Sequence, residues 1–184
     1  MFEFKDDKKE NLTSMLLNLS NVEDEAFDFF SKLASLTEKP EMKKKFNEIA
    51  SDSKKHAIAF RKVGSQIGDV VVKNKQCQKM MESISSVFKK AHKEIEEKTS
   101  ITNEELLRIA HILDKSSVEE YFMQVQTKTL QLLANKIGSS YKVEFEGYQD
   151  MFMGISREEE NHRAIIENVI EELESPTKIG VKSS

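Results

Sequence analysis

A glutamate and a histidine interrupt a helical stripe of apolar residues near the end of the chain. The apolar residues recur at alternating steps of three and four, which places them on one helix face. They are Phe145, Tyr148, Phe152, Ile155, Ile166, Val169 and Leu173. Glu159 and His162 occupy the two remaining positions of this stripe, three residues apart. A buried carboxylate and a buried imidazole each need a partner. A metal ion would serve both, and a hydrogen-bonded Glu159–His162 pair is the alternative.

A second stripe of the same kind occurs in the first half of the chain. It consists of Met42, Phe46, Ile49, Phe60, Val63 and Ile67. One constant offset superimposes the two stripes and places His56 on His162. The same offset places Ser53 where the later stripe has Glu159. This internal repeat predicts two helices that each offer a histidine to a shared centre inside a helical bundle.

Five segments resemble the erythrin domain of rubrerythrin-type ferritin-like proteins. They are Glu25–Ala34, Pro40–Met42, Phe46–Ala50, Lys55–Ala57 and Glu158–His162. The resemblance covers the first, second and last predicted helices well, whereas the third helix and the crossover before it match poorly. It implies an all-α, ferritin-like four-helix bundle of two antiparallel helical hairpins that holds metal between its helices.

The resemblance also implies a set of metal ligands. These are Glu25, His56, Glu120, Glu159 and His162. In this set Glu25 is the ligand from helix one, and Glu159 takes the place of a bridging carboxylate.

The ligand from helix three is open between several residues. Glu120 is preferred because aromatic residues follow it much as they follow Glu25. Glu119 and Asp114 are the other candidates, and the repeat offset would instead place Gln131 opposite Glu25.

Ser53 departs from the family pattern, which has a glutamate at this position. A di-iron centre needs carboxylates to offset the charge of its ions, and Ser53 is neutral. Asp52 is turned about 100° away from the His56 face of its own helix. We therefore expect a single metal ion, an asymmetric pair of reduced affinity, or a site without metal.

Helix start and stop signals divide the chain into five predicted helices. Pro40 ends the first helix and begins the second, Gly68 ends the second, and Thr102 with Glu105 has capping-box spacing. The predicted helices span about 11–38, 40–67, 75–97, 103–137 and 141–174. The additional helix over 75–97 belongs to the crossover between helices two and three of the bundle, and it lies either along the bundle or on a dimerisation surface.

Composition favours one helical domain. The chain has 184 residues, with two Pro, six Gly and 33% charged residues, which is typical of long helices with solvated outer faces. We expect one domain over 1–174 and a disordered tail over 175–184. The net charge of −4 with mixed signs argues against nucleic-acid binding. The absence of a long apolar run argues against a membrane span, and the single Cys77 excludes an internal disulfide. These features predict a cytoplasmic protein.

The resemblance implies a rubrerythrin-like protein with an iron centre, or one of manganese or zinc. Such a centre would perform oxygen- or peroxide-directed redox chemistry or iron handling, as a di-iron-type oxidoreductase or peroxidase. A separate protein would donate electrons, and the chain would form a homo-oligomer, expected to be a dimer. The alternative is a ferritin-like bundle with a degenerate, metal-free site that acts as a structural or interaction module.

Overall fold

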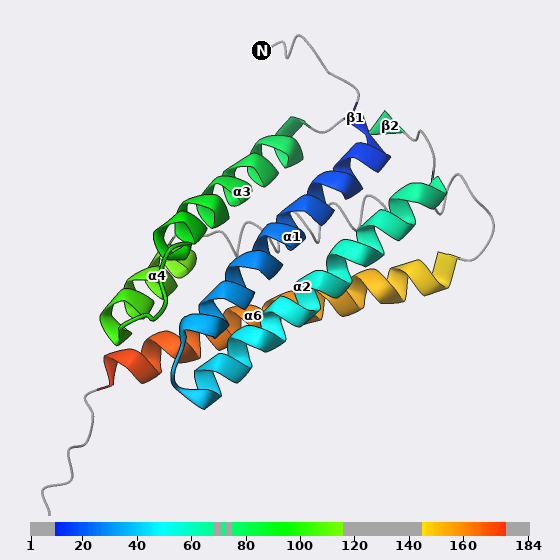
Figure 1. The fold of residues 1–184 in the computed structure, drawn as a ribbon. Coiled ribbons are helices and arrows are strands. Elements are labelled where there is room, and N and C mark those ends of the chain that lie inside the picture. Colours follow the sequence, from blue (N-terminus) through cyan, green and yellow to red (C-terminus); the bar gives the residue numbers. More distant parts are fainter. Residues whose placement is uncertain (1–9, 68–70, 73–74, 116–144, 176–184) are drawn as a thin grey trace, which may run out of the picture.

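The computed structural model describes residues 10–67, 71–72, 75–115 and 145–175, and within these ranges the chain is almost entirely helical (Figure 1). Its helices are α1 (Leu12–Leu36), α2 (Pro40–Ile67), α3 (Lys75–Ile95), α4 (Asn103–Lys115) and α6 (Phe145–Glu174). Two short strands, β1 (Glu10–Asn11) and β2 (Val71–Val72), pair with each other. The predicted all-α class is therefore confirmed.

Helices α1 and α2 form an antiparallel hairpin (Figure 1). The Thr37 hydroxyl donates to the Leu33 carbonyl oxygen at 2.7 Å at the end of α1. Pro40 then takes the first position of α2, where its missing N–H would have had no helical partner. At the other end of the hairpin, Glu10 of β1 pairs with Val72 of β2, which ties the start of α1 to the segment after α2. The predicted bounds of the second helix, 40–67, are confirmed.

Helix α6 runs antiparallel to α2 and lays the later apolar stripe against the earlier one (Figure 1). The rings of Phe60 and Phe152, one from each stripe, stack with their centroids 6.3 Å apart. Both rings are buried. The predicted helix over 141–174 is confirmed from Phe145 onward, and positions 141–144 lie outside the described residues.

Helices α3 and α4 lie on the side of α1 that is away from α2 in the view of Figure 1. α3 packs along α1, and α4 packs on α6. The predicted capping box opens α4, because the Glu105 N–H donates to the Thr102 hydroxyl at 3.2 Å and the Thr102 N–H donates to the Glu105 carboxylate at 3.0 Å. The helix predicted over 103–137 is observed as far as Lys115, and 116–144 lie outside the described residues.

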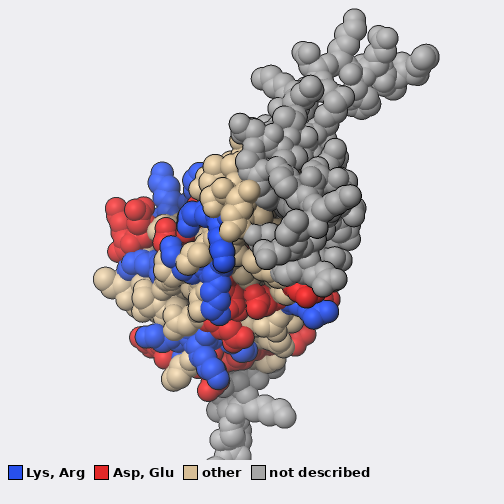
Figure 2. All heavy atoms as spheres, turned by 90° about the vertical axis from the view of Figure 1, so that its right-hand side faces the viewer, with Lys and Arg blue, Asp and Glu red and all other residues tan. Residues whose placement is uncertain are grey.

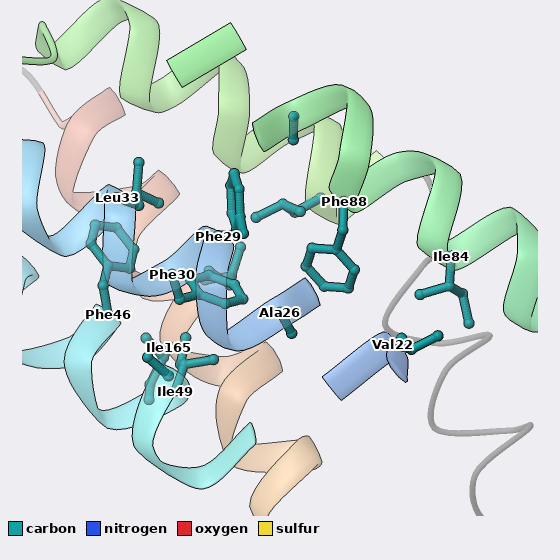
Figure 3. Packing of buried hydrophobic residues seen from close by; sticks show 14 of the residues in the cluster. Val22, Ala26, Phe29, Phe30, Leu33, Phe46, Ile49, Ile84, Phe88 and Ile165 are labelled. Atoms are coloured by element: carbon teal, nitrogen blue, oxygen red, sulfur yellow. The ribbon is translucent and has the colours of Figure 1, made fainter. Parts of the chain in front are cut away.

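Aromatic side chains of α1 link the hairpin to α3. Phe30 stacks on Phe46 of α2 at 6.3 Å between ring centroids, and Phe88 of α3 lies 6.2 Å from Phe30 and 5.9 Å from Phe29 (Figure 3). All four rings are buried. Burial of each such side chain stabilises the fold by about 1.5–3 kcal/mol. This cluster fixes α1 against its neighbours and thereby holds the adjacent turns of α1 in register with α2.

Charges of both signs are mixed over the surface. In the space-filling view, Lys and Arg alternate with Asp and Glu, and neither sign gathers into a single patch on this face (Figure 2). None of the described helices combines the length and the apolar character that a membrane crossing requires.

Candidate metal centre

Three helices each contribute one acidic or imidazole side chain to a single buried point. Glu23 comes from α1, His56 from α2 and Glu159 from α6, and one donor atom from each lies within 4.8 Å of the other two. Nδ1 of His56 is 3.3 Å from Oε1 of Glu23 and 3.0 Å from Oε1 of Glu159. The exposed fractions of the three residues are 1%, 2% and 8%. The arrangement thus places two carboxylates around one imidazole nitrogen, out of contact with bulk water.

The second histidine of the repeat faces the first. The ring centroids of His56 and His162 are 6.1 Å apart with an angle of 31° between the ring planes. Nδ1 of His162 lies 3.6 Å from Oε1 of Glu159, so this oxygen stands near the inner nitrogens of both rings. The expectation that the repeat directs two histidines into one centre agrees with these positions.

The outer nitrogen of each histidine meets a carboxylate from the opposite helix. Nε2 of His56 is 2.6 Å from Oε2 of Glu158, and Nε2 of His162 is 3.4 Å from Oδ2 of Asp52. The sequence prediction set Asp52 aside because it is turned away from the His56 face. The crossing of α2 with α6 instead brings Asp52 to the histidine of the neighbouring helix.

Glu25, the residue expected from the resemblance, lies elsewhere. Its carboxylate accepts a hydrogen bond from the Ser85 hydroxyl at 3.0 Å and pairs with Lys89 Nζ at 3.0 Å, so it faces α3. Glu23 takes the inward position on α1. Two residues correspond to about 200° of rotation around a helix, which separates these two side chains onto different faces.

A signal for Glu23 was present in the sequence. The apolar residues of α1 follow the same steps of three and four as the other two stripes, and Glu23 is the charged position within them. These residues are Leu16, Leu19, Ala26, Phe30 and Leu33, all buried. The periodicity that singled out Glu159 would therefore have selected Glu23, whereas the resemblance selected Glu25.

The remaining candidates are placed as follows. Ser53 is buried at 2% exposure and brings no charge to the centre. Asp114 lies within α4, and Glu119, Glu120 and Gln131 lie outside the described residues. A ligand from the third helix of the predicted bundle stays a prediction.

Burial and close charges set the protonation of the group. Burial by itself would lower the pKa of His56, but the carboxylates of Glu159 and Glu23 outweigh it and raise this pKa to about 11. Burial would likewise raise the pKa of Glu159, yet His162 and His56 lower it to about 2. For Glu23, burial and the negative charge of Glu159 outweigh the opposite effect of His56 and raise the pKa to about 7. At neutral pH the metal-free centre therefore holds an ionised Glu159 beside a protonated His56, and a Glu23 carboxyl group whose pKa of about 7 leaves it partly protonated.

This donor set fits a divalent transition metal. Imidazole nitrogens with carboxylate oxygens suit iron, manganese and zinc. Among the described residues, Nδ1 of His56 and Oε1 of Glu159 find no aligned hydrogen-bond partner, although they lie 3.0 Å apart. Buried polar atoms of this kind are normally satisfied, and a cation between them would satisfy both. Glu23, His56 and Glu159 could hold such an ion, with His162 beside them.

No protein-family model matches the chain, and neither a curated protein nor a solved structure shows significant similarity to it. A functional conclusion must therefore come from the geometry of this centre.

Proposed function

We propose that the protein is a ferritin-like, rubrerythrin-like metalloprotein that binds a divalent transition metal at Glu23, His56 and Glu159. One observation carries the proposal: three different helices direct a donor atom each to one buried point, within 4.8 Å of one another. Packing alone does not account for this convergence, because bringing two carboxylates together in a dry interior costs free energy. A cation removes that cost.

The centre favours one ion over two. Two carboxylates stand next to His56, whereas Glu159 is the inward carboxylate near His162. Ser53 occupies the place where a second shared carboxylate would offset the charge of a second ion. We therefore expect about one tightly bound ion per chain.

Iron is the ion proposed for this centre, and when bound it would supply the electron-transfer steps for oxygen- or peroxide-directed redox chemistry or for iron handling. The protein's own residues bind the ion and limit water around it. Phe60 and Phe152 pack α2 on α6 about one and two helical turns from His56 and Glu159 along the chain, and both are buried. A separate electron donor and a homodimer belong to the same proposal.

The experiment that tests the proposal compares two glutamates of α1. Protein purified from iron-supplemented cells is analysed for metal by mass spectrometry, in the natural form and as Glu23→Gln and Glu25→Gln. We expect about one metal per chain in the natural form, a loss of most metal in Glu23→Gln, and no change in Glu25→Gln, because Glu25 faces α3. The opposite result for the two variants would overturn the ligand assignment and support the residue that the resemblance selects.

A second function is favoured by the charge balance of the metal-free centre. His56 is already flanked by Glu23 and Glu159, and Ser53 removes one carboxylate from the group. A bundle of this kind that binds no metal would be a structural or interaction module. Absence of metal from correctly folded natural protein, even after loading with ferrous iron or zinc, would favour this function.

A further inference from the structure

We infer that Asp52 and Glu158 are positioning residues, each of which holds the outer nitrogen of the histidine on the opposite helix and so turns its inner nitrogen toward the metal centre. The inference rests on the proposed metal centre and adds residues that are not themselves ligands. It concerns a reciprocal contact between α2 and α6, in which each helix supplies one histidine and one outer carboxylate.

The contact is symmetric in the repeat. Glu158 of α6 is 2.6 Å from Nε2 of His56, and Asp52 of α2 is 3.4 Å from Nε2 of His162. The offset that relates the two stripes also relates these two carboxylates. The inner position one residue later is different, because it holds Ser53 in α2 and Glu159 in α6. Both copies therefore have the outer carboxylate, while one copy has the inner one.

A carboxylate in this place selects the form of the ring that can bind metal. An ionised carboxylate can only accept a hydrogen bond. The histidine nitrogen that faces it, Nε2, must therefore carry the hydrogen and donate it. In a neutral imidazole the other nitrogen, Nδ1, then has the free lone pair that a metal needs. On both histidines Nδ1 is the nitrogen near Glu159. The outer carboxylates thus direct the two lone pairs toward the centre.

The two contacts between an outer carboxylate and a histidine differ in length, and this difference predicts which carboxylate affects metal affinity more. The His56–Glu158 contact is short, at 2.6 Å. Asp52 lies 3.4 Å from His162 and also accepts from Lys55 Nζ at 2.7 Å, so its charge is shared with a lysine. The shorter contact acts on the histidine that stands beside both Glu23 and Glu159. Glu158 should therefore affect metal affinity more than Asp52.

Zinc affinity measured on the full chain tests the inference. Zn²⁺ is titrated in competition with a chelator, for the natural protein, Glu158→Ala and Asp52→Ala. Loss of an outer partner typically weakens metal binding by about 10–100-fold. We expect a loss in this range for Glu158→Ala and a smaller loss for Asp52→Ala. Glu160→Ala and Glu48→Ala are the matched controls, since they remove the same charge from exposed positions of the same helices, and they should leave the affinity unchanged.

Proton–nitrogen NMR of the histidine side chains in the zinc-loaded protein distinguishes a positioning role from a general effect of removing a negative charge. Glu158→Ala should release the Nε2-bound proton of His56 to solvent exchange while that of His162 stays protected, and Asp52→Ala should do the reverse. Glu158→Gln, which keeps a hydrogen-bond acceptor, should restore part of the protection and affinity. This variant decides the matter if the alanine variant lowers the melting temperature of the metal-free protein.

The outcomes distinguish this inference from the proposed function. If the natural protein binds zinc and the Glu158 variants bind it as tightly, the positioning role is wrong and the metal centre stands. If the natural protein binds no zinc or iron, both are wrong.

Discussion

Helices α2 and α6 present two copies of one stripe, and the copies differ in charge at the inner position. In α6 the inner position is Glu159, whose Oε1 lies within 3.6 Å of the inner nitrogens of both histidines. In α2 the inner position is Ser53, which is equally buried but neutral. The apolar frame around both is the same, because each stripe keeps its steps of three and four.

The difference shows how one copy can obtain a charge that its own helix lacks. Glu23 approaches His56 from α1, with its carboxylate 3.3 Å from Nδ1. The histidine of α2 therefore has two carboxylates next to its inner nitrogen although α2 contributes neither. The asymmetry of the repeat becomes an asymmetry of the centre, in which the His56 side carries most of the negative charge.

Making the two copies alike by removing the α6 carboxylate should have the largest effect. Glu159→Ser takes away the oxygen that both histidines share, and we expect no measurable binding of iron or zinc. The metal-free protein should also lose about 3–5 kcal/mol of unfolding free energy, since a buried charge pair is broken. Metal analysis and urea unfolding measure the two effects, and Glu160→Ser on the exposed side of α6 is the control. Metal binding that survives in Glu159→Ser would show that Glu159 is not a ligand.

Adding a carboxylate to α2, so that its stripe matches that of α6, should create a second metal position. Ser53→Glu supplies a second inner carboxylate, and we expect the metal content to rise to about two ions per chain. Without metal, the same variant buries a further negative charge and should unfold at a lower temperature than the natural protein. Metal should restore this stability. Ser51→Glu, at an exposed position of α2, should change neither quantity. An unchanged metal content in Ser53→Glu would mean that the centre lacks a further ligand.

Much of the architecture could be predicted because it depends on local signals. Pro40 sets the start of α2, and Thr102 with Glu105 forms the capping box that opens α4. The repeat of apolar steps was enough to predict that His56 and His162 lie on inward faces. These features involve residues a few positions apart, whose geometry a helix determines.

The parts of the centre that were missed depend on contacts between helices. Asp52 was judged from the face it occupies on α2, but its contact with His162 is made possible by the position of α6. Glu23 was missed for another reason: the resemblance pointed to Glu25, and the position of Glu23 among the buried residues of α1 was not used. The part of the predicted third bundle helix that carries Glu120, after Lys115, lies outside the described residues.

The smallest expected effect is the difference between the two histidines in how the stability of the metal-free protein depends on pH. A group whose pKa is higher in the folded state stabilises the fold while it is protonated, and this stabilisation is lost as the pH rises through the folded pKa. For His56 the pKa is raised from 6.5 to about 11, because Glu159 and Glu23 outweigh its burial. The free energy of unfolding should therefore fall between about neutral pH and pH 11, by at most about 1.4 kcal/mol per pH unit.

Substitution of each histidine in turn separates the contributions. The pKa of His162 is also raised, since Glu159 and Asp52 outweigh its burial and the opposing charge of His56. His56 is flanked by two buried carboxylates, whereas His162 has one buried carboxylate and one that also pairs with Lys55. In urea unfolding with a chelator present, His56→Gln should flatten the decline above neutral pH more than His162→Gln. An equal decline in both variants would show that the two halves of the repeat carry the same charge, and the asymmetry argued from Ser53 and Glu23 would then fail.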